Sequence, residues 1–160
     1  MYGVQLIRRN LNDPTTFGDK AVAWWTAKFS DKFNGKWRFG YSHCELYFPN
    51  NNRMFSASQY ENKVRFKNKL NVGSNWEIIK IYKRWHRGYN NLMLSCDLLL
   101  DKKYDYLGIF GFIIPKIKQD KNKWFCSEVC AFILDYNKLE HFDKPFSKYS
   151  PNSLALTLNK

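Results

Sequence analysis

Residues 126–134 read CSEVCAFIL and predict an α-helix whose first residue is a cysteine. Apolar residues follow with helical spacing, so one face of this helix should pack against the core. The apolar positions are Val129, Cys130, Ile133 and Tyr136. The first turn of a helix carries unpaired backbone N–H groups and the positive end of the helix dipole. Both favour thiolate over thiol, so Cys126 is a candidate nucleophile.

A cysteine nucleophile needs a base beside it, and the chain has three histidines. One of them, His43, lies in residues 40–48, where the alternating pattern predicts a β-strand. We therefore pair His43 with Cys126 as a candidate Cys-His site. The alternative is structural, because free cysteines are among the most buried residues and a strand histidine can belong to the core. Cys130, one helical turn after Cys126, fits that interpretation and should point into the core.

Length and composition predict one domain. With 160 residues and 44% hydrophobic content, the chain is long enough for one well-packed core and too short for two ordinary domains. We therefore expect a single domain over residues 1–160. No stretch reaches the roughly 18 apolar residues of a membrane span. Residues 1–9 lack the pattern of a signal peptide, which favours a cytoplasmic location.

The four cysteines have no regular spacing, which favours reduced thiols over a disulfide framework. A structural zinc site is the competing interpretation, since Cys44 adjoins a histidine and Cys126 and Cys130 lie one helical turn apart. No pair of cysteines has the Cys-x-x-Cys spacing of compact zinc sites. We therefore predict no metal and no cofactor.

The chain carries 26 Lys and Arg against 14 Asp and Glu, a net charge of +12. The excess is concentrated in three basic clusters, in which bases alternate with aromatic or aliphatic residues. These clusters are residues 63–69, 80–87 and 116–123. Such a field attracts nucleic acid, anionic lipid headgroups or an acidic partner. The alternative is that the clusters are solvated faces of a basic protein.

The order of the expected elements predicts the α+β class. A helical pattern near the start is followed by a run of strand patterns separated by turn signals, and helical patterns dominate the second half. The expected strands are residues 4–9, 40–48, 53–58, 63–66 and 76–83, and the expected helices are residues 19–29, 88–100 and the helix from Cys126, preceded by a short segment at 104–113. We expect an antiparallel sheet or small barrel packed against helices.

Several segments resemble, in order, the motifs of one enzyme family. They are a strand-histidine motif at residues 42–46 (SHCEL), the next strands at 54–58 (MFSAS) and 63–66 (KVRF), an aromatic-Gly segment at 104–108 (YDYLG), a nucleophile motif at 125–129 (FCSEV) and a chain ending at 150–154 (SPNSL). The family that these motifs resemble is the circularly permuted branch of the NlpC-type papain-like cysteine hydrolases. That branch includes YiiX-like proteins, a poxvirus virion protein and, more distantly, lecithin:retinol acyltransferase. The resemblance covers most of the chain from residue 40 onward.

The resemblance implies a permuted papain-like fold with Cys126 as nucleophile and His43 as base. Many members carry glycine where this chain has Glu45, and place an acidic residue on the following strand, where this chain has Ser56. Period-2 alternation puts Glu45 and His43 on one face of their strand, so Glu45 can orient the imidazole. We therefore consider Glu45 first and Ser56 second as the third site residue. A solvated surface charge is the alternative for Glu45.

The resemblance also implies a reaction. The Cys126 thiolate would attack an amide or ester carbonyl, His43 would move the proton, and backbone N–H groups at the helix start would stabilise the oxyanion. Members of the family act on peptidoglycan cross-links or acyl lipids, so we expect a peptide, peptidoglycan-fragment or acyl-lipid substrate. The small size, the Asn-, Lys- and aromatic-rich composition and the viral relatives favour a bacteriophage origin, with the protein in the host cytoplasm or in a virion. The alternative function is a basic module on the same fold that binds nucleic acid or an anionic surface without catalysis.

Overall fold

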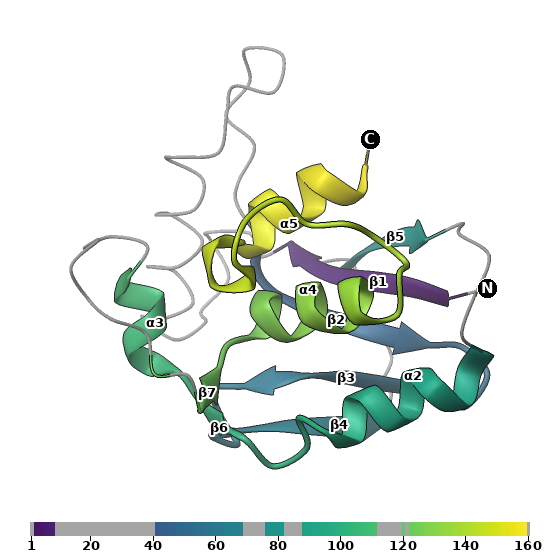
Figure 1. Cartoon of the computed structure of the whole chain (residues 1–160), viewed down its shortest axis with the longest axis horizontal. Helices are drawn as coiled ribbons and strands as arrows, with labels where there is room; N and C mark the ends of the chain where they lie inside the picture. Colours follow the sequence, from purple (N-terminus) through teal and green to yellow (C-terminus); the bar gives the residue numbers. More distant parts are fainter. Residues whose placement is uncertain are drawn as a thin grey trace.

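The computed structural model describes residues 2–8, 41–68, 76–81, 88–111, 120 and 122–159. The helix expected at residues 19–29 lies outside these ranges, as do most residues of the basic clusters 80–87 and 116–123. The described ranges combine strands and helices in one sheet with helices packed on it, which confirms the α+β class (Figure 1).

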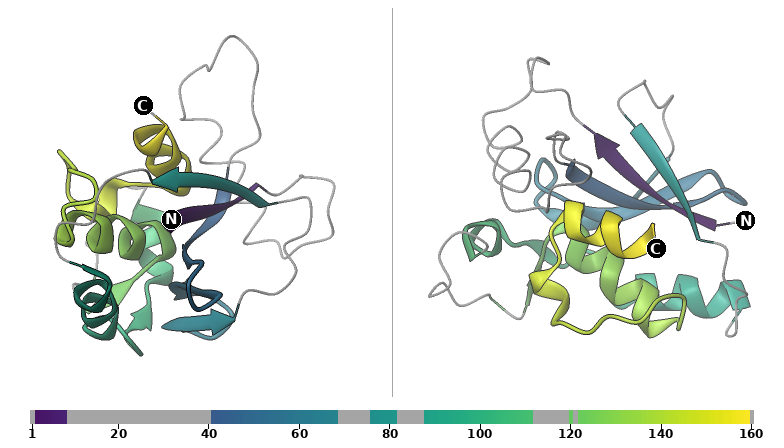
Figure 2. Two further views of the ribbon diagram at one scale, coloured as in Figure 1. Left: turned by 90° about the vertical axis from the view of Figure 1, so that its right-hand side faces the viewer. Right: turned by 90° about the horizontal axis from the view of Figure 1, so that it is seen from above.

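Within the described ranges, seven strands form one sheet in the order β5-β1-β2-β3-β4-β6-β7. The strands are β1 (Tyr2–Arg8), β2 (Tyr41–Phe48), β3 (Arg53–Ser58), β4 (Lys63–Asn68), β5 (Trp76–Ile81), β6 (Lys103–Tyr104) and β7 (Lys123–Trp124). Neighbouring strands are antiparallel except β6 and β7, which are parallel. The sheet curls into an open half-barrel (Figure 2). The expectation of an antiparallel sheet therefore holds except for the short parallel pair at one edge.

Helices cover one side of this sheet, as the three views in Figures 1 and 2 show. They are α2 (Gly88–Asp97), α4 (Cys126–Tyr136) and α5 (Pro151–Leu158), while α3 (Tyr106–Gly111) lies near β7 and the single turn η1 (Phe146–Lys148) precedes α5. The helix α5 was not expected, although Ser150 and Pro151 are typical of a helix start. The Ser150 hydroxyl caps the helix by accepting from the backbone N–H of Ser153 at 3.2 Å.

Asparagines shape the two hairpins that place β2, β3 and β4 side by side. Asn52, before β3, and Asn62, before β4, each adopt a positive φ of 52°. Asparagine tolerates this left-handed conformation better than most residues because its side chain can bond the local backbone. These turns fix the register between the strands that carry the candidate site residues.

The core lies between α4 and the sheet. On α4, Val129, Cys130 and Ile133 are fully buried, as the helical spacing predicted. Tyr136 was expected on the same apolar face but is 44% exposed. It is the last residue of the helix, and its ring stacks on Phe132 at 5.6 Å, an arrangement that leaves the phenol at the surface. No helix within the described ranges is long and apolar enough to cross a membrane.

Candidate active site

Cys126 is the first residue of α4, and its neighbours fix the approach to the helix. Phe125, just before the helix, is buried and extended, and its side chain makes no capping hydrogen bond. The Ser127 hydroxyl donates to the carbonyl oxygen of Tyr149 at 2.6 Å, which ties the first turn to the segment before α5. The first turn of α4 therefore has no cap from the side chain that precedes it.

The first half of β2 lies along a gap in the sheet. The ladder between β2 and β3 covers only residues 46–48, opposite residues 53–55. Among the described strands, residues 41–45 pair with β1 alone. Across the gap, the Ser56 hydroxyl donates to the carbonyl oxygen of Cys44 at 2.7 Å. The N–H and C=O of a strand residue point to the same edge, so the Cys44 N–H also faces the gap.

The sulfur of Cys126 meets β2 at this open edge. Cys44 and the imidazole of His43 are the neighbours that act on the charge of this sulfur. Side chains of consecutive strand residues point to opposite faces of a sheet. A single sulfur can contact both of them because β3 does not occupy this edge of β2.

These contacts separate the pKa values of neighbouring groups. The hydrogen bond from Cys44 is the largest influence on Cys126. Burial acts to raise the pKa of Cys126. Cys44 and His43 together outweigh burial and lower that pKa well below its usual range. Burial acts to lower the pKa of His43, but Cys126 and then Glu45 outweigh burial and raise that pKa to about 10. Burial, with the hydrogen bonds to Cys126 and Cys130, raises the pKa of Cys44. Neutral pH therefore favours a Cys126 thiolate and a His43 imidazolium, with Cys44 protonated.

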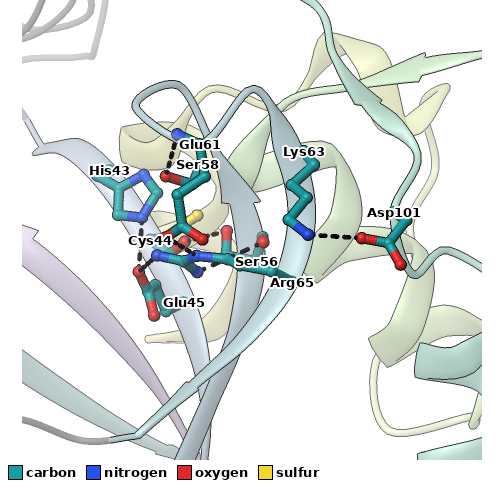
Figure 3. A network of polar contacts seen from close by, with 9 residues as sticks. All are labelled: His43, Cys44, Glu45, Ser56, Ser58, Glu61, Lys63, Arg65 and Asp101. Atoms are coloured by element: carbon teal, nitrogen blue, oxygen red, sulfur yellow. Dashed lines mark hydrogen bonds and ion pairs between the residues drawn. The ribbon is translucent and has the colours of Figure 1, made fainter.

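Glu45 contacts the imidazole of His43 through Nε2 (Figure 3). Oε1 of Glu45 lies 2.9 Å from Nε2 of His43 and 3.0 Å from Nη2 of Arg65. Burial acts to raise the pKa of Glu45, but His43 and then Arg65 lower it to about 2. Glu45 is thus a buried, ionised carboxylate rather than a solvated surface charge.

Arg65 belongs to this network and was missed by the sequence analysis. Its guanidinium contacts Oε1 of Glu45 through Nη2 and Oε1 of Glu61 through Nε, both at 3.0 Å. Arg65 belongs to the basic cluster 63–69 in the sequence, but it is only 6% exposed. Lys63 of the same cluster pairs with Asp101 at 2.8 Å. The register Ser56↔Arg65 between β3 and β4 carries Arg65 towards Glu45, and a single sequence does not contain that register.

The structure brings three of the four expected site residues into one chain of contacts: Cys126, His43 and Glu45. Ser56 lies beside them in the gap between β2 and β3. It is fully buried, and its hydroxyl bonds the carbonyl oxygen of Cys44 rather than the imidazole. Ser56 therefore holds the separated half of β2 to β3.

The segment before α5 and the first turn of α5 connect both sides of the site. Its Tyr149 carbonyl accepts the Ser127 hydroxyl at the start of α4. The side-chain oxygen of Asn152 accepts from the backbone N–H of Tyr41 at 2.7 Å, at the start of β2. Asn152 belongs to the SPNSL segment that was noted only as a motif. Its contact gives that segment a structural role, because it anchors β2 two residues before the histidine.

All four cysteines are free and buried. Within the described ranges, no group of three or more His, Cys, Asp or Glu residues is arranged to hold a metal ion. Comparisons of the chain with models of protein families, with curated proteins and with solved structures found no match.

Proposed function

We propose that the chain is a cysteine-dependent hydrolase or acyltransferase that acts on an amide or ester carbonyl. The proposal rests on the chain of contacts from Cys126 through His43 to Glu45, in which neutral pH favours charge on both the sulfur and the ring. A nucleophile, a base and an orienting carboxylate in contact are the groups that activate a cysteine. Packing alone explains why Cys130 is buried. Packing alone does not require the lowered pKa that the Cys126 thiol has.

In the proposed reaction, the Cys126 thiolate attacks the carbonyl carbon. Backbone N–H groups at the start of α4, including that of Cys126, stabilise the oxyanion that forms. His43 gives its proton to the leaving amine or alcohol, which leaves a thioester on the sulfur. Water then attacks the thioester while His43 accepts its proton, or another hydroxyl or amine takes the acyl group. Glu45 keeps the ring oriented throughout.

The finer fold assignment and the substrate are part of the same proposal. His43 on β2 precedes Cys126 on α4 in the chain, and this order supports a permuted papain-like domain. We infer a peptide, a peptidoglycan fragment or an acyl lipid as substrate, and a place of action in a host cytoplasm or a virion. Each of these substrates presents the amide or ester carbonyl that the reaction needs.

Acyl transfer to Cys126 is the direct test. The protein is incubated with p-nitrophenyl acetate, and nitrophenol release and acetylation of the tryptic peptide 124–138 are measured. We expect both in the wild type and neither in Cys126→Ala. Cys130→Ala is the matched control, because it removes another buried thiol one turn later on the same helix. Acetylation without Cys126, or no acetylation of the wild type, would contradict the proposal.

The charge of the chain supports a second candidate function, binding to nucleic acid or an anionic surface. The net charge is +12, and Lys67 and Lys80 are exposed. Counterion release makes such binding fall steeply with salt. Binding to an anionic polymer is therefore measured from about 50 mM to about 500 mM salt, together with the alkylation rate of Cys126. Binding that weakens while the alkylation rate stays constant would separate a charged surface from the thiol site. No binding at any salt would exclude this candidate.

A further inference from the structure

The imidazole of His43 and the guanidinium of Arg65 share one carboxylate oxygen. Oε1 of Glu45 lies 2.9 Å from Nε2 of His43 and 3.0 Å from Nη2 of Arg65. The two nitrogens are therefore at most about 6 Å apart, a distance at which two positive charges repel each other in a protein interior. A second cation at this oxygen weakens the hold of the carboxylate on the imidazolium. The proposed reaction gives that cation no role, so its presence needs an explanation.

Arg65 reaches this oxygen across strand β3. It lies on β4, two strands away from Glu45 on β2, and it pairs with Ser56 of β3. Neighbouring strands are about 4.8 Å apart, so a long side chain that passes a small one can span the distance. Figure 3 shows the Arg65 side chain running past Ser56 towards Glu45. Both members of the ion pair are buried, with Glu45 at 3% and Arg65 at 6% exposure.

We propose that Arg65 is a positioning residue of the candidate site, the permanent counter-charge of Glu45 that allows His43 to give up and take back a proton. The inference rests on the proposed function, because the proposed reaction is what requires His43 to change its charge. It adds to that function a residue that acts on the base through Glu45.

A buried carboxylate such as Glu45 needs a compensating cation throughout the reaction. When the C–N or C–O bond of the substrate breaks, a ring proton of His43 passes to the leaving nitrogen or oxygen, and the ring becomes neutral. His43 then no longer compensates the carboxylate. A guanidinium stays charged at physiological pH, so Arg65 compensates Glu45 in both states of the ring. Without Arg65, the transfer would leave an uncompensated buried charge, and the ring would hold its proton more tightly.

Two carboxylates keep the guanidinium of Arg65 charged. Burial acts to lower the pKa of Arg65, but Glu45 and then Glu61 outweigh burial and raise that pKa. Glu61 contacts Nε of Arg65 at 3.0 Å and is 46% exposed, so it holds the guanidinium from the solvent side. Within the described ranges, the groups that act on the charge of His43 are Cys126 on α4 and Glu45 on its own strand, and Arg65 and Glu61 follow behind Glu45.

Titration of the His43 ring by NMR tests the proposal without any substrate. The chain has three histidines, so isotope-labelled histidine gives few ring signals, and His43→Gln assigns one of them. All variants carry Cys126→Ala, because Cys126 acts to raise the pKa of His43 and its removal brings the transition to lower pH. Arg65→Gln should raise the pH of half-protonation of the ring by about one or more, because a positive charge about 6 Å away is lost. Arg65→Lys restores that charge and should return the midpoint towards its starting value.

Glu61→Gln is the matched control. Glu61 contacts the same guanidinium at the same distance as Glu45, but its carboxylate is exposed, so the midpoint should not rise. An equal rise in Glu61→Gln, or no rise in Arg65→Gln, would overturn the proposal. If Arg65→Gln does not fold, Glu45→Gln is compared with Glu45→Gln/Arg65→Gln, which has no buried ion pair left to break. The double variant should titrate at the higher pH, and equal midpoints would overturn the proposal.

The role of Arg65 and the proposed function fail in different ways. If p-nitrophenyl acetate does not acetylate Cys126 in the wild type, both are overturned, because the reaction that Arg65 would serve is absent. If Cys126 is acetylated but the His43 midpoint is the same with and without the charge of Arg65, only the role of Arg65 is overturned.

Discussion

The two halves of strand β2 differ in what lies along their edge. Residues 46–48 pair with β3, and Leu46 and Phe48 pack into the core at 4% and 2% exposure. Residues 41–45 pair with β1 alone among the described strands, and their free edge receives Cys126 and the Ser56 hydroxyl. The comparison teaches that the candidate site forms where strand pairing stops. One half of β2 is paired with β3, and the other half holds the charged groups.

The largest expected effect comes from the paired half. Phe48→Ala should lower the free energy of unfolding by about 3–5 kcal/mol, because it leaves a cavity in a buried cluster where the Phe48 ring lies 6.2 Å from Phe66. Urea unfolding measures the loss. The pH profile of Cys126 alkylation in the folded protein should not change. A shifted profile would show that the two halves are not separate.

In the other half of β2, Glu45→Gln should lower the free energy of unfolding by about 3 kcal/mol. The variant breaks a buried ion pair and leaves the positive charge of Arg65 with less compensating negative charge. The pKa of Glu45 is about 2 in the fold against an ordinary 4.5, so its contribution is present above about pH 4.5 and is lost as the pH falls towards 2. Urea unfolding of both proteins at several pH values should therefore show their difference shrinking in acid.

Glu61→Gln is the matched control for that variant. Glu61 contacts the same guanidinium at the same distance of 3.0 Å, but its side chain is 46% exposed. We expect a loss below about 1 kcal/mol, because solvent screens exposed ion pairs. Equal losses in the two variants would contradict a special role for the buried carboxylate.

An effect smaller than that of Glu45→Gln is expected from Ser56→Ala, which removes the donor to the Cys44 carbonyl across the gap. The loss should be about 1–2 kcal/mol, the cost of one buried hydrogen bond. Amide hydrogen exchange should accelerate in residues 41–45 and stay unchanged in residues 46–48. Ser95→Ala, which removes a buried donor to the Leu92 carbonyl in α2, should leave the exchange of β2 unchanged. Uniform acceleration along β2 would contradict the division into two halves.

Local patterns in the sequence predicted most of the elements that carry the candidate site. Alternation predicted β2 and β3, helical spacing predicted the helix from Cys126, and period 2 placed Glu45 on the face of His43. The structure has these elements, with β3 at the expected residues and with contact between Glu45 and His43. Such features are local, because they depend on residues only a few positions apart.

Features that depend on long-range geometry were not predictable in this way. The early end of the β2–β3 ladder, the approach of Arg65 and the contact of Cys44 with Cys126 all depend on register and helix placement. Arg65 in particular has the sequence context of a surface charge, with lysines on either side. Only the pairing of β4 with β3 reveals that it faces a buried carboxylate.

The central claim is that His43 and Cys126 form a charged pair, and the pH dependence of Cys126 alkylation by iodoacetamide tests it most directly. The pKa of Cys126 is lowered, so its thiolate persists below the usual range. The pKa of His43 is raised to about 10, so the imidazolium persists up to about that pH. The wild-type rate at pH 6 should stay within about twofold of the rate at pH 8, whereas a thiol of pKa about 8.5 would lose about 75-fold. His43→Ala should move the profile towards that of the ordinary thiol. A wild-type profile that already follows the ordinary thiol, or one that His43→Ala leaves unchanged, would contradict the account.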